Sequence, residues 1–337
     1  MTETATATTS PEETSRHGEV FRRGWALVAR KEIADTLRSV RFFLIVAVIT
    51  IASVASIQAA ASTIRDAAQG AQEDPALFLR LFTLAPEDMP SVFSFFGLVG
   101  LLAPLLGIAF GFDAISSERS QGTLPRILSH PVHRDDVING KFAAGLAVIA
   151  LTLAATMALV TGMGMWRLGI TPDAGQIARL IAYLFVAVVY AGAWLAFAIL
   201  CSVIFERAAS SALTTIVVWL LFTIFWQLLA GLAADRIAPA SEDATFQEQL
   251  RNVRLELTIN RFSPQTLYEE ASTALLAPDV RSLDVLLPEQ VDRAVFGQLS
   301  FTQSLLIVWT QISVLVGLIL GLFAYAYSLF LRQEVRA

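Results

Sequence analysis

Six apolar segments, each roughly 20 residues long or longer, most constrain how this chain can fold. They cover residues 42–60, 92–112, 142–166, 178–205, 211–234 and 304–331. A helix of about 20 apolar residues spans the hydrocarbon core of a bilayer. None of these segments alternates apolar and polar residues as the strands of a membrane β-barrel do. The sequence therefore predicts an all-α integral membrane protein with six transmembrane helices.

The composition of the chain agrees with this prediction. Hydrophobic residues make up 55% of the sequence and charged residues only 16%, whereas soluble domains carry about a quarter charged residues. The single cysteine, Cys201, excludes an intramolecular disulfide and a thiolate cluster. We interpret it as a small buried apolar residue.

Basic residues are concentrated in segments that would lie on one side of the membrane. They precede the first span and fill the loop between the second and third spans, and short loops rich in Arg and Lys stay on the cytosolic side. The residues concerned are Arg16, Arg22, Arg23, Arg30, Lys31, Arg38, Arg41, Arg119, Arg126, Arg134 and Lys141. We therefore expect both termini to be cytosolic, with residues 1–17 forming a disordered cytosolic tail.

Residues 18–41 have the pattern of an amphipathic helix in the cytosolic interface. Apolar residues recur at three- and four-residue spacing, and Lys31, Asp35 and Arg38 occupy another face. Trp25 and Phe21 are candidate anchors in the headgroup region. The alternative is a charged flank that does no more than orient the first span.

The cytosolic loop 113–141 is predicted to be ordered. Leu124, Ile127 and Leu128 are spaced as an apolar helix face, and the His130-Pro131 pair would end that helix. Asp135 and Asp136 then favour the start of another helix. Two interpretations remain open: the apolar face contacts a partner protein, or it packs against the spans.

The loop 235–300 lies on the opposite, extracytoplasmic side. Ser263 is a candidate N-cap and Pro264 stands at a first helical position. We expect a small helical cap, too short to be an independent enzyme domain.

Catalytic and nucleotide-binding motifs are missing from the sequence. Gly140-Lys141 is followed by Phe142 and not by the Ser or Thr of a phosphate loop. His130 and His133 have neither a third histidine nor a thiolate beside them, so no metal site is predicted. Acids and lysines are absent from the third, fifth and sixth spans, which disfavours an ion-coupled carrier, a charged-ring channel and an intramembrane enzyme.

The loop and its flanks resemble the signature of permeases of type-2 ABC (ATP-binding cassette) exporters. The matching positions are Ile115, Glu118, Gly122-Thr123-Leu124, Leu128, Pro131-Val132, Arg134 and Gly140-Lys141. Pro125 departs from the pattern, in which a polar or basic residue is commoner. The Lys31, Glu32, Asp35 and Arg38 segment resembles the elbow helix that opens such permeases. Ser263-Pro264 and Tyr268 are similar to the subgroup that includes the nitrous-oxide-reductase maturation permease.

The resemblance covers residues 20 to 335 and implies a non-enzymatic permease in a prokaryotic cell membrane. It implies a second permease copy, identical or different, and a cytosolic ATPase subunit that carries the ATP and Mg. No cofactor is expected in this chain, and its other partner is membrane lipid, not nucleic acid. The ATPase-coupling residues that it implies are Glu118, Gly122, Thr123, Leu124, Leu128, Pro131, Val132, Arg134, Gly140, Lys141, Lys31, Glu32, Asp35 and Arg38.

In this family the second and fifth spans line the substrate route and the dimer contact. The candidate path residues here are Phe95, Phe96, Trp219, Phe222, Trp226 and Gln227. The alternative for any one of these aromatic residues is packing between helices or against lipid. The alternative function is a non-transporting membrane sensor or scaffold whose outer loop binds a ligand.

Overall fold

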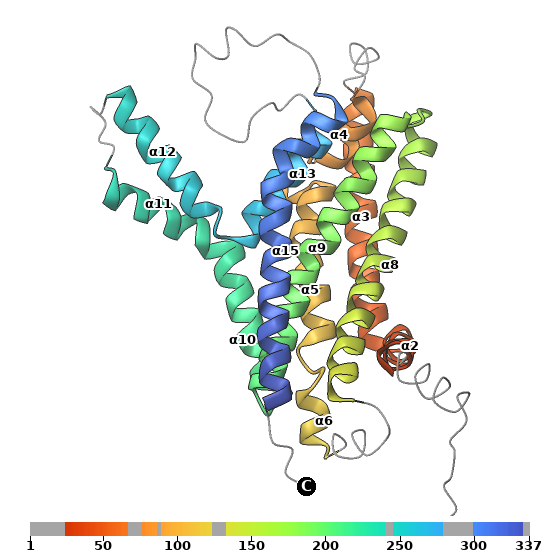
Figure 1. The fold of residues 1–337 in the computed structure, drawn as a ribbon. Coiled ribbons are helices and arrows are strands. Elements are labelled where there is room, and N and C mark those ends of the chain that lie inside the picture. Colours follow the sequence, from red (N-terminus) through yellow and green to blue (C-terminus); the bar gives the residue numbers. More distant parts are fainter. Residues whose placement is uncertain are drawn as a thin grey trace, which may run out of the picture.

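The computed structural model describes residues 24–66, 76–85, 89–122, 133–239, 245–278 and 299–332. These residues form helices, turns and irregular segments without a β-strand. Six helical segments are long and apolar enough to cross a bilayer, and they stand side by side as a bundle (Figure 1). The all-α, six-span prediction is confirmed.

The six spans have the following bounds. They are α3 (Val40–Asp66), α5 (Phe95–Gly111), α8 (Arg134–Leu168), α9 (Ala174–Ile204), α10 (Ala208–Leu220) with its continuation α11 (Trp226–Ile237), and α15 (Phe301–Arg332). Helix α8 begins eight residues before the predicted apolar segment, because its first turns are polar and contact the rest of the protein. Helix α9 begins earlier than predicted because Asp173 and Gln176 form a capping box.

Helix α9 is the centre of the bundle. It packs against α5, α8, α10 and α15, and 78% of its apolar stretch is buried. Glycines of α5 let the two backbones approach: a Cβ on Gly107 would lie 2.5 Å from the Ala191 carbonyl oxygen, and one on Gly111 would lie 2.6 Å from Ala198 Cβ. Small residues at such contacts are the usual basis of close helix packing in membranes.

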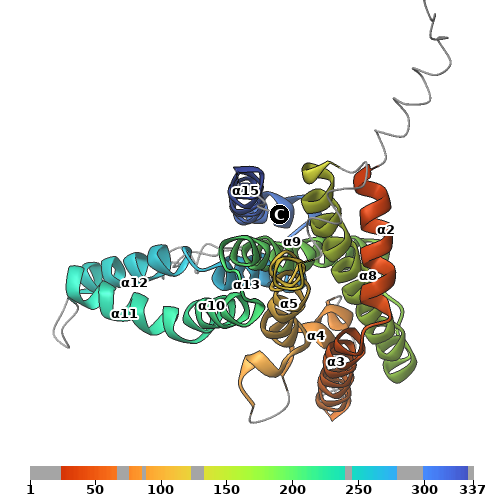
Figure 2. The same cartoon turned by 90° about the horizontal axis from the view of Figure 1, so that it is seen from below.

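One end of the bundle, which we call the α2 end, is crossed by α2 (Gly24–Leu37). Seen from below, α2 lies beside the start of α8 and runs across the spans rather than along them (Figures 1 and 2). The short helix α6 (Ser116–Ser120) and the last residues of α15 lie at the same end. An interfacial helix near this position is expected from the sequence, although residues 18–23 lie outside the described part of the chain.

The opposite end, which we call the α13 end, carries α4 (Leu77–Thr83), the short 3₁₀ turn η1 (Ser91–Phe93) and α13 (Pro264–Leu276). Ser263 caps α13 by accepting a hydrogen bond from the Gln265 amide, and Pro264 is its first residue, as expected. The helix is not a surface cap, however. It packs among α5, α9 and α15 and buries nine of its residues.

The fifth span is not a single regular helix. A π-helical segment, η2 (Leu221–Phe225), separates α10 from α11, and α11 then leaves the bundle with α12 (Phe246–Asn260) packed along it (Figure 1). Asn252 holds this pair together by donating hydrogen bonds to Asp235 Oδ1 and the Ala238 carbonyl, both at 2.9 Å. Insertion of a π-turn re-aims a helix and is frequent at functional sites.

Candidate functional site

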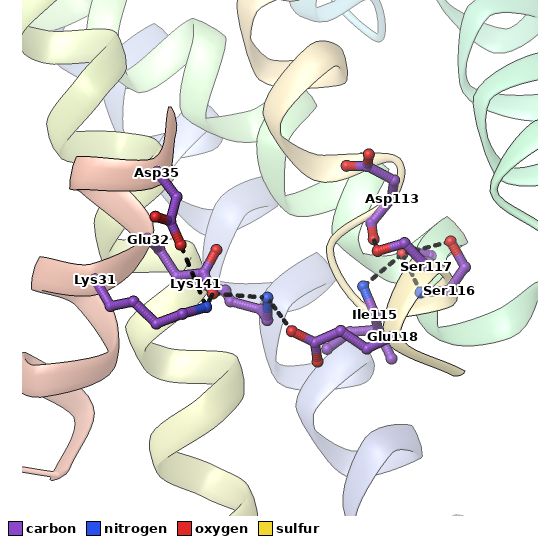
Figure 3. Close-up of polar contacts among 10 residues, drawn as sticks. Lys31, Glu32, Asp35, Asp113, Ile115, Ser116, Ser117, Glu118 and Lys141 are labelled. Atoms are coloured by element: carbon purple, nitrogen blue, oxygen red, sulfur yellow. Dashed lines mark hydrogen bonds and ion pairs between the residues drawn. The ribbon is translucent and has the colours of Figure 1, made fainter. Parts of the chain in front are cut away.

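A cluster of charged residues at the α2 end is centred on Lys141 of α8. Its ammonium Nζ lies 2.8 Å from Glu118 Oε1 of α6 and 3.1 Å from Glu32 Oε1 of α2. Figure 3 shows Lys141 between the two carboxylates. The Lys141 side chain is only 8% exposed, and those of Glu118 and Glu32 are 14% and 23% exposed. One cation therefore joins three elements that are far apart in the sequence.

Lys31 extends this cluster toward solvent. Its Nζ lies 3.3 Å from Glu32 Oε1 and 3.4 Å from Asp35 Oδ2, on a side chain that is 65% exposed. Partial burial opposes the charged form, but the attraction of Glu32 and Asp35 outweighs it and raises the pKa of Lys31 above its usual value. Exposed pairs of this kind contribute little to stability, because water and salt screen them.

Two residues of α8 explain why α2 lies where it does. Gly140 faces α2 so closely that a Cβ there would lie 2.7 Å from Val28 Cβ and 2.8 Å from the Trp25 carbonyl oxygen. One turn earlier, Asp136 Oδ1 accepts a hydrogen bond of 3.0 Å from the Trp25 amide and places a negative charge at the N-terminus of α2. The adjacent Gly140 and Lys141 thus have separate tasks: glycine permits close contact and lysine supplies the charge.

The segment after α5 is anchored to α9 by a serine. Ser202 Oγ accepts hydrogen bonds from the backbone amides of Ile115 and Ser116 at 2.9 and 3.0 Å. Nearby, Asp113 Oδ2 pairs with Arg41 of α3. Ser202 carries no sequence signal that could have identified it, because a lone serine near a span end is unremarkable. Asp113 and Arg41 could have been matched only as opposite charges that flank spans.

A cavity of about 510 Å³ lies among α2, α3, α5 and α8 beside this cluster. Acidic and basic side chains both line it, so it has no strong net charge. The charged lining residues are Lys31, Glu32, Asp35, Arg41, Asp113, Glu118 and Lys141. A cavity of this composition at the end of a span is better suited to water or a zwitterionic group than to an apolar ligand.

The structure brings together only part of the predicted coupling set. Glu32, Glu118 and Lys141 are in direct contact, with Lys31 and Asp35 beside them. Arg38 lies exposed beyond the last residue of α2, Arg134 begins α8, and Gly122 has a positive φ of 67°. The remaining members, Thr123, Leu124, Leu128, Pro131 and Val132, lie outside the described residues.

The predicted path residues do not form one surface. Phe95 is 1% exposed and packs edge-to-face on Phe82 at a centroid distance of 5.3 Å. Trp219 is 9% exposed. Phe222 lines an apolar cavity of about 200 Å³ between α9, α10 and α15, and its ring lies 4.9 Å from that of Trp226.

Phe96 and Gln227, by contrast, line a polar cavity of about 440 Å³ at the α13 end. This cavity also contains Gln265 and Glu269 of α13. The sequence does not predict a functional role for either side chain, because it indicates that this segment belongs to a small cap on the surface.

Arg179 is a buried charge that is not among the functional residues predicted from the sequence. It lies in α9 and is 5% exposed. Its guanidinium donates hydrogen bonds to the Leu275 carbonyl at 3.1 Å, to Ser304 Oγ at 2.8 Å and to the Leu299 carbonyl at 2.5 Å. A single arginine near the start of an apolar span was the available signal, because such charges persist only where partners satisfy them.

A six-span helical bundle with a helix crossing one end, joined to the spans by largely buried charges, defines a polytopic membrane protein. Comparison with protein families identifies it further. Residues 26–335 match the model described as ABC-2 family transporter protein, and the chain belongs to this family. It is a type-2 ABC permease, as the signature around Glu118 and Gly140-Lys141 predicts.

A curated relative agrees with this assignment. The chain is 27% identical over 214 residues to the probable ABC transporter permease protein NosY of Stutzerimonas stutzeri. The aligned region covers 60% of this chain and 67% of the relative.

Proposed function

We propose that this chain is the permease subunit of an ABC exporter and that a separate cytosolic ATPase docks at its α2 end. The family establishes a transporter permease. The excess of basic residues in the segment before α3 and in the segment between α5 and α8 supports a cytosolic α2 end, with both termini on that side. The resemblance to type-2 permeases further implies the cell membrane of a prokaryote. Membership of a transporter family disfavours the sensor or scaffold alternative.

The observation that carries the coupling proposal is the contact of Lys141 with Glu118 and Glu32. Helix α6, which contains Glu118, and helix α2 are both joined to the same turn of α8. A push on either element is therefore transmitted to the other.

The cluster also reaches several spans. Glu118 follows α5 directly, Ser202 ties the start of α6 to α9, and the pairing of Arg41 with Asp113 adds α3. In this proposal ATP hydrolysis on the partner moves α2 and α6 as one unit, and the spans reorient with them. A second permease copy completes the transporter.

Purification of the tagged full-length chain from its native membranes tests the proposal. We expect an ATP-hydrolysing subunit to copurify in stoichiometric amount with the wild-type chain. The Lys141→Met variant should insert normally, but the complex purified with it should have several-fold lower ATPase activity. Lys31→Met is the matched control, because that ammonium is 65% exposed, and it should retain activity within about twofold.

The result that contradicts the proposal is equally plain. A pure, folded preparation of the wild-type chain without any ATPase would remove the basis for an ATP-driven permease. Retention of full ATPase activity by Lys141→Met would leave the family assignment intact but remove the coupling role of the cluster.

A further inference from the structure

The polar cavity at the α13 end is lined by five elements, and one of its described lining residues has an ionisable side chain. Its walls come from η1, the start of α5, the π-helical η2 with the start of α11, and α13. The lining residues are Ser91, Val92, Phe96, Gly97, Leu101, Thr223, Gln227, Gln265, Glu269 and Thr273. Glu269 is the charged member of this set, so an ionised Glu269 makes the cavity negative.

A chain of hydrogen bonds orients the carboxyl group of Glu269. Tyr190 of α9 donates its hydroxyl hydrogen to Gln265 Oε1 at 2.5 Å, and Gln265 Nε2 donates to Glu269 Oε1 at 2.7 Å. The Tyr190 hydroxyl also lies 3.2 Å from the Gly100 carbonyl, a second acceptor for its single hydrogen. Among the described residues this arrangement occupies Oε1 of Glu269 and leaves Oε2 available to the cavity.

Other groups around the cavity are acceptors or can act as acceptors. Thr223 Oγ1, in the π-helical segment, is buried and has no hydrogen-bond partner within the described residues. The Gly97 amide at the N-terminus of α5 is not available as a donor to the cavity, because it already donates a hydrogen bond to Ser94 Oγ. Phe96 presents an aromatic ring, whose face attracts cations.

The neighbouring charges are already paired. Glu270 pairs with Arg261 at 2.9 Å and accepts from Gln311 Nε2 at 2.8 Å. Arg179 is engaged with the Leu275 and Leu299 carbonyls and with Ser304. Neither of these groups lines the cavity, and the described lining residues include no basic side chain.

We propose that this cavity binds the ammonium group of an organic amine, held by Glu269 with help from Thr223, Gln227 and the ring of Phe96. The group can belong to the transported molecule or to a phosphatidylethanolamine headgroup. Assignment to the transported molecule rests on the proposed export function, for which Phe96 and Gln227 are candidate path residues.

Acidity should oppose this binding. Burial raises the pKa of Glu269 above its usual value, and the Gln265 hydrogen bond offsets this only in part. A proton and an ammonium ion therefore compete for the same carboxylate. Affinity should rise as the pH rises through the elevated pKa of Glu269.

A thermal-unfolding titration of the full-length chain with ethylammonium chloride tests the site. The protein is held in phosphatidylglycerol nanodiscs at pH 8, with sodium chloride and propanol as controls for ionic strength and for a neutral isostere. We expect a saturable rise in the melting temperature for the wild type, which weakens on acidification. Glu269→Gln should shift the titration at least tenfold to higher concentration, because Gln keeps the Gln265 contact but loses the charge.

Glu256→Gln is the matched control, since Glu256 of α12 lies outside the cavity and its loss should leave the titration unchanged. Absence of a saturable shift in the wild type, or an equal shift in Glu269→Gln, would overturn the proposal. Repeating the titration with phosphatidylethanolamine in the nanodisc separates the two sources. Competition identifies the lipid headgroup, and an unchanged curve identifies a soluble amine. No ATPase is present, so failure here is distinct from failure of the proposed function.

Discussion

At the scale of single residues, burial decides which of the two lysines in the α2-end cluster matters. Lys31 and Lys141 both contact Glu32, but their side chains are 65% and 8% exposed. Water screens the first pair, whereas removal of the second cation takes a largely buried partner from both Glu118 and Glu32. Two ion pairs with similar distances can therefore differ greatly in their contribution to stability.

Replacement of Lys141 by Met should lower the stability of the folded chain. We expect a loss of about 2 kcal/mol, below the roughly 3–5 kcal/mol of fully buried pairs because both carboxylates retain some water. Lys31→Met should change stability by less than about 0.5 kcal/mol. Thermal unfolding of the purified variants measures both effects. Equal losses would show that exposure does not rank these two lysines.

At the scale of elements, the position of α2 depends on the face of α8 that it contacts. Gly140 permits the approach and Asp136 caps the N-terminus of α2. The same helix also contains Gly162, around which a Cβ would meet nothing within 4 Å. The two glycines have the same helix propensity, and only their surroundings distinguish them.

Gly140→Ala and Gly162→Ala should therefore change stability in opposite directions. Alanine in a helix interior is favoured over glycine by roughly 0.5–1 kcal/mol, so Gly162→Ala should be neutral or stabilising. Gly140→Ala should destabilise the chain and detach α2, because the methyl group collides with Val28 and with the Trp25 backbone. Limited proteolysis within residues 24–37, together with the melting temperature, follows both outcomes. Protection of α2 in Gly140→Ala would contradict this account of the contact.

Arg179 has a comparable role at the α13 end, where it joins α9 to α13 and α15. Arg179→Met leaves two carbonyls and Ser304 without their donor, and each buried unsatisfied group costs about 1–3 kcal/mol. We expect the melting temperature to fall more than in Lys141→Met, with Arg179→Lys intermediate. Arg236→Met, an exposed arginine of α11, is the control and should have little effect. If the melting temperature of Arg179→Met falls no more than that of the control, the hydrogen bonds of Arg179 are not needed for stability.

At the scale of the whole molecule, burial is distributed very unevenly among the spans. Only 6% of the apolar stretch of the fifth span is buried, compared with 78% in α9. Large apolar side chains such as Leu213, Val217 and Leu228 are exposed along it. Lipid can cover such a face, but so can a second copy of the chain, and the resemblance to type-2 permeases predicts a dimer contact that includes the fifth span.

Cysteine cross-linking distinguishes these coverings. In a Cys201→Ala background, which removes the buried native thiol, we expect Val217→Cys on α10 to form a disulfide-linked dimer in native membranes. Leu320→Cys on α15 is the matched control, since its side chain is equally apolar and 64% exposed, and it should remain monomeric on the gel. Efficient cross-linking at position 320 and none at 217 would move the dimer contact away from the fifth span.

Only part of the candidate site could be predicted from the sequence. The signature around Glu118, Gly140 and Lys141 is local in the sequence, and its charges do meet. Ser202, Asp113 and Arg179 could not be assigned roles, since each acts through a partner more than 70 residues away in the sequence. The roles of Gln265 and Glu269 could not be predicted for a different reason. Polar residues of a predicted surface loop are expected to face water, and not to line a cavity.

The sequence by itself determined that the chain spans a membrane six times as helices and that it resembles the type-2 permeases. Because backbone hydrogen bonds must be satisfied inside the bilayer, only helices and closed β-barrels span it, and long apolar segments without the alternating pattern of a barrel leave only helices. Only the tertiary structure decided which helix is central, that η2 turns α11 out of the bundle, and that α13 packs inward to enclose Glu269. These features depend on contacts between distant residues, on which the hydrophobicity of a segment has no bearing.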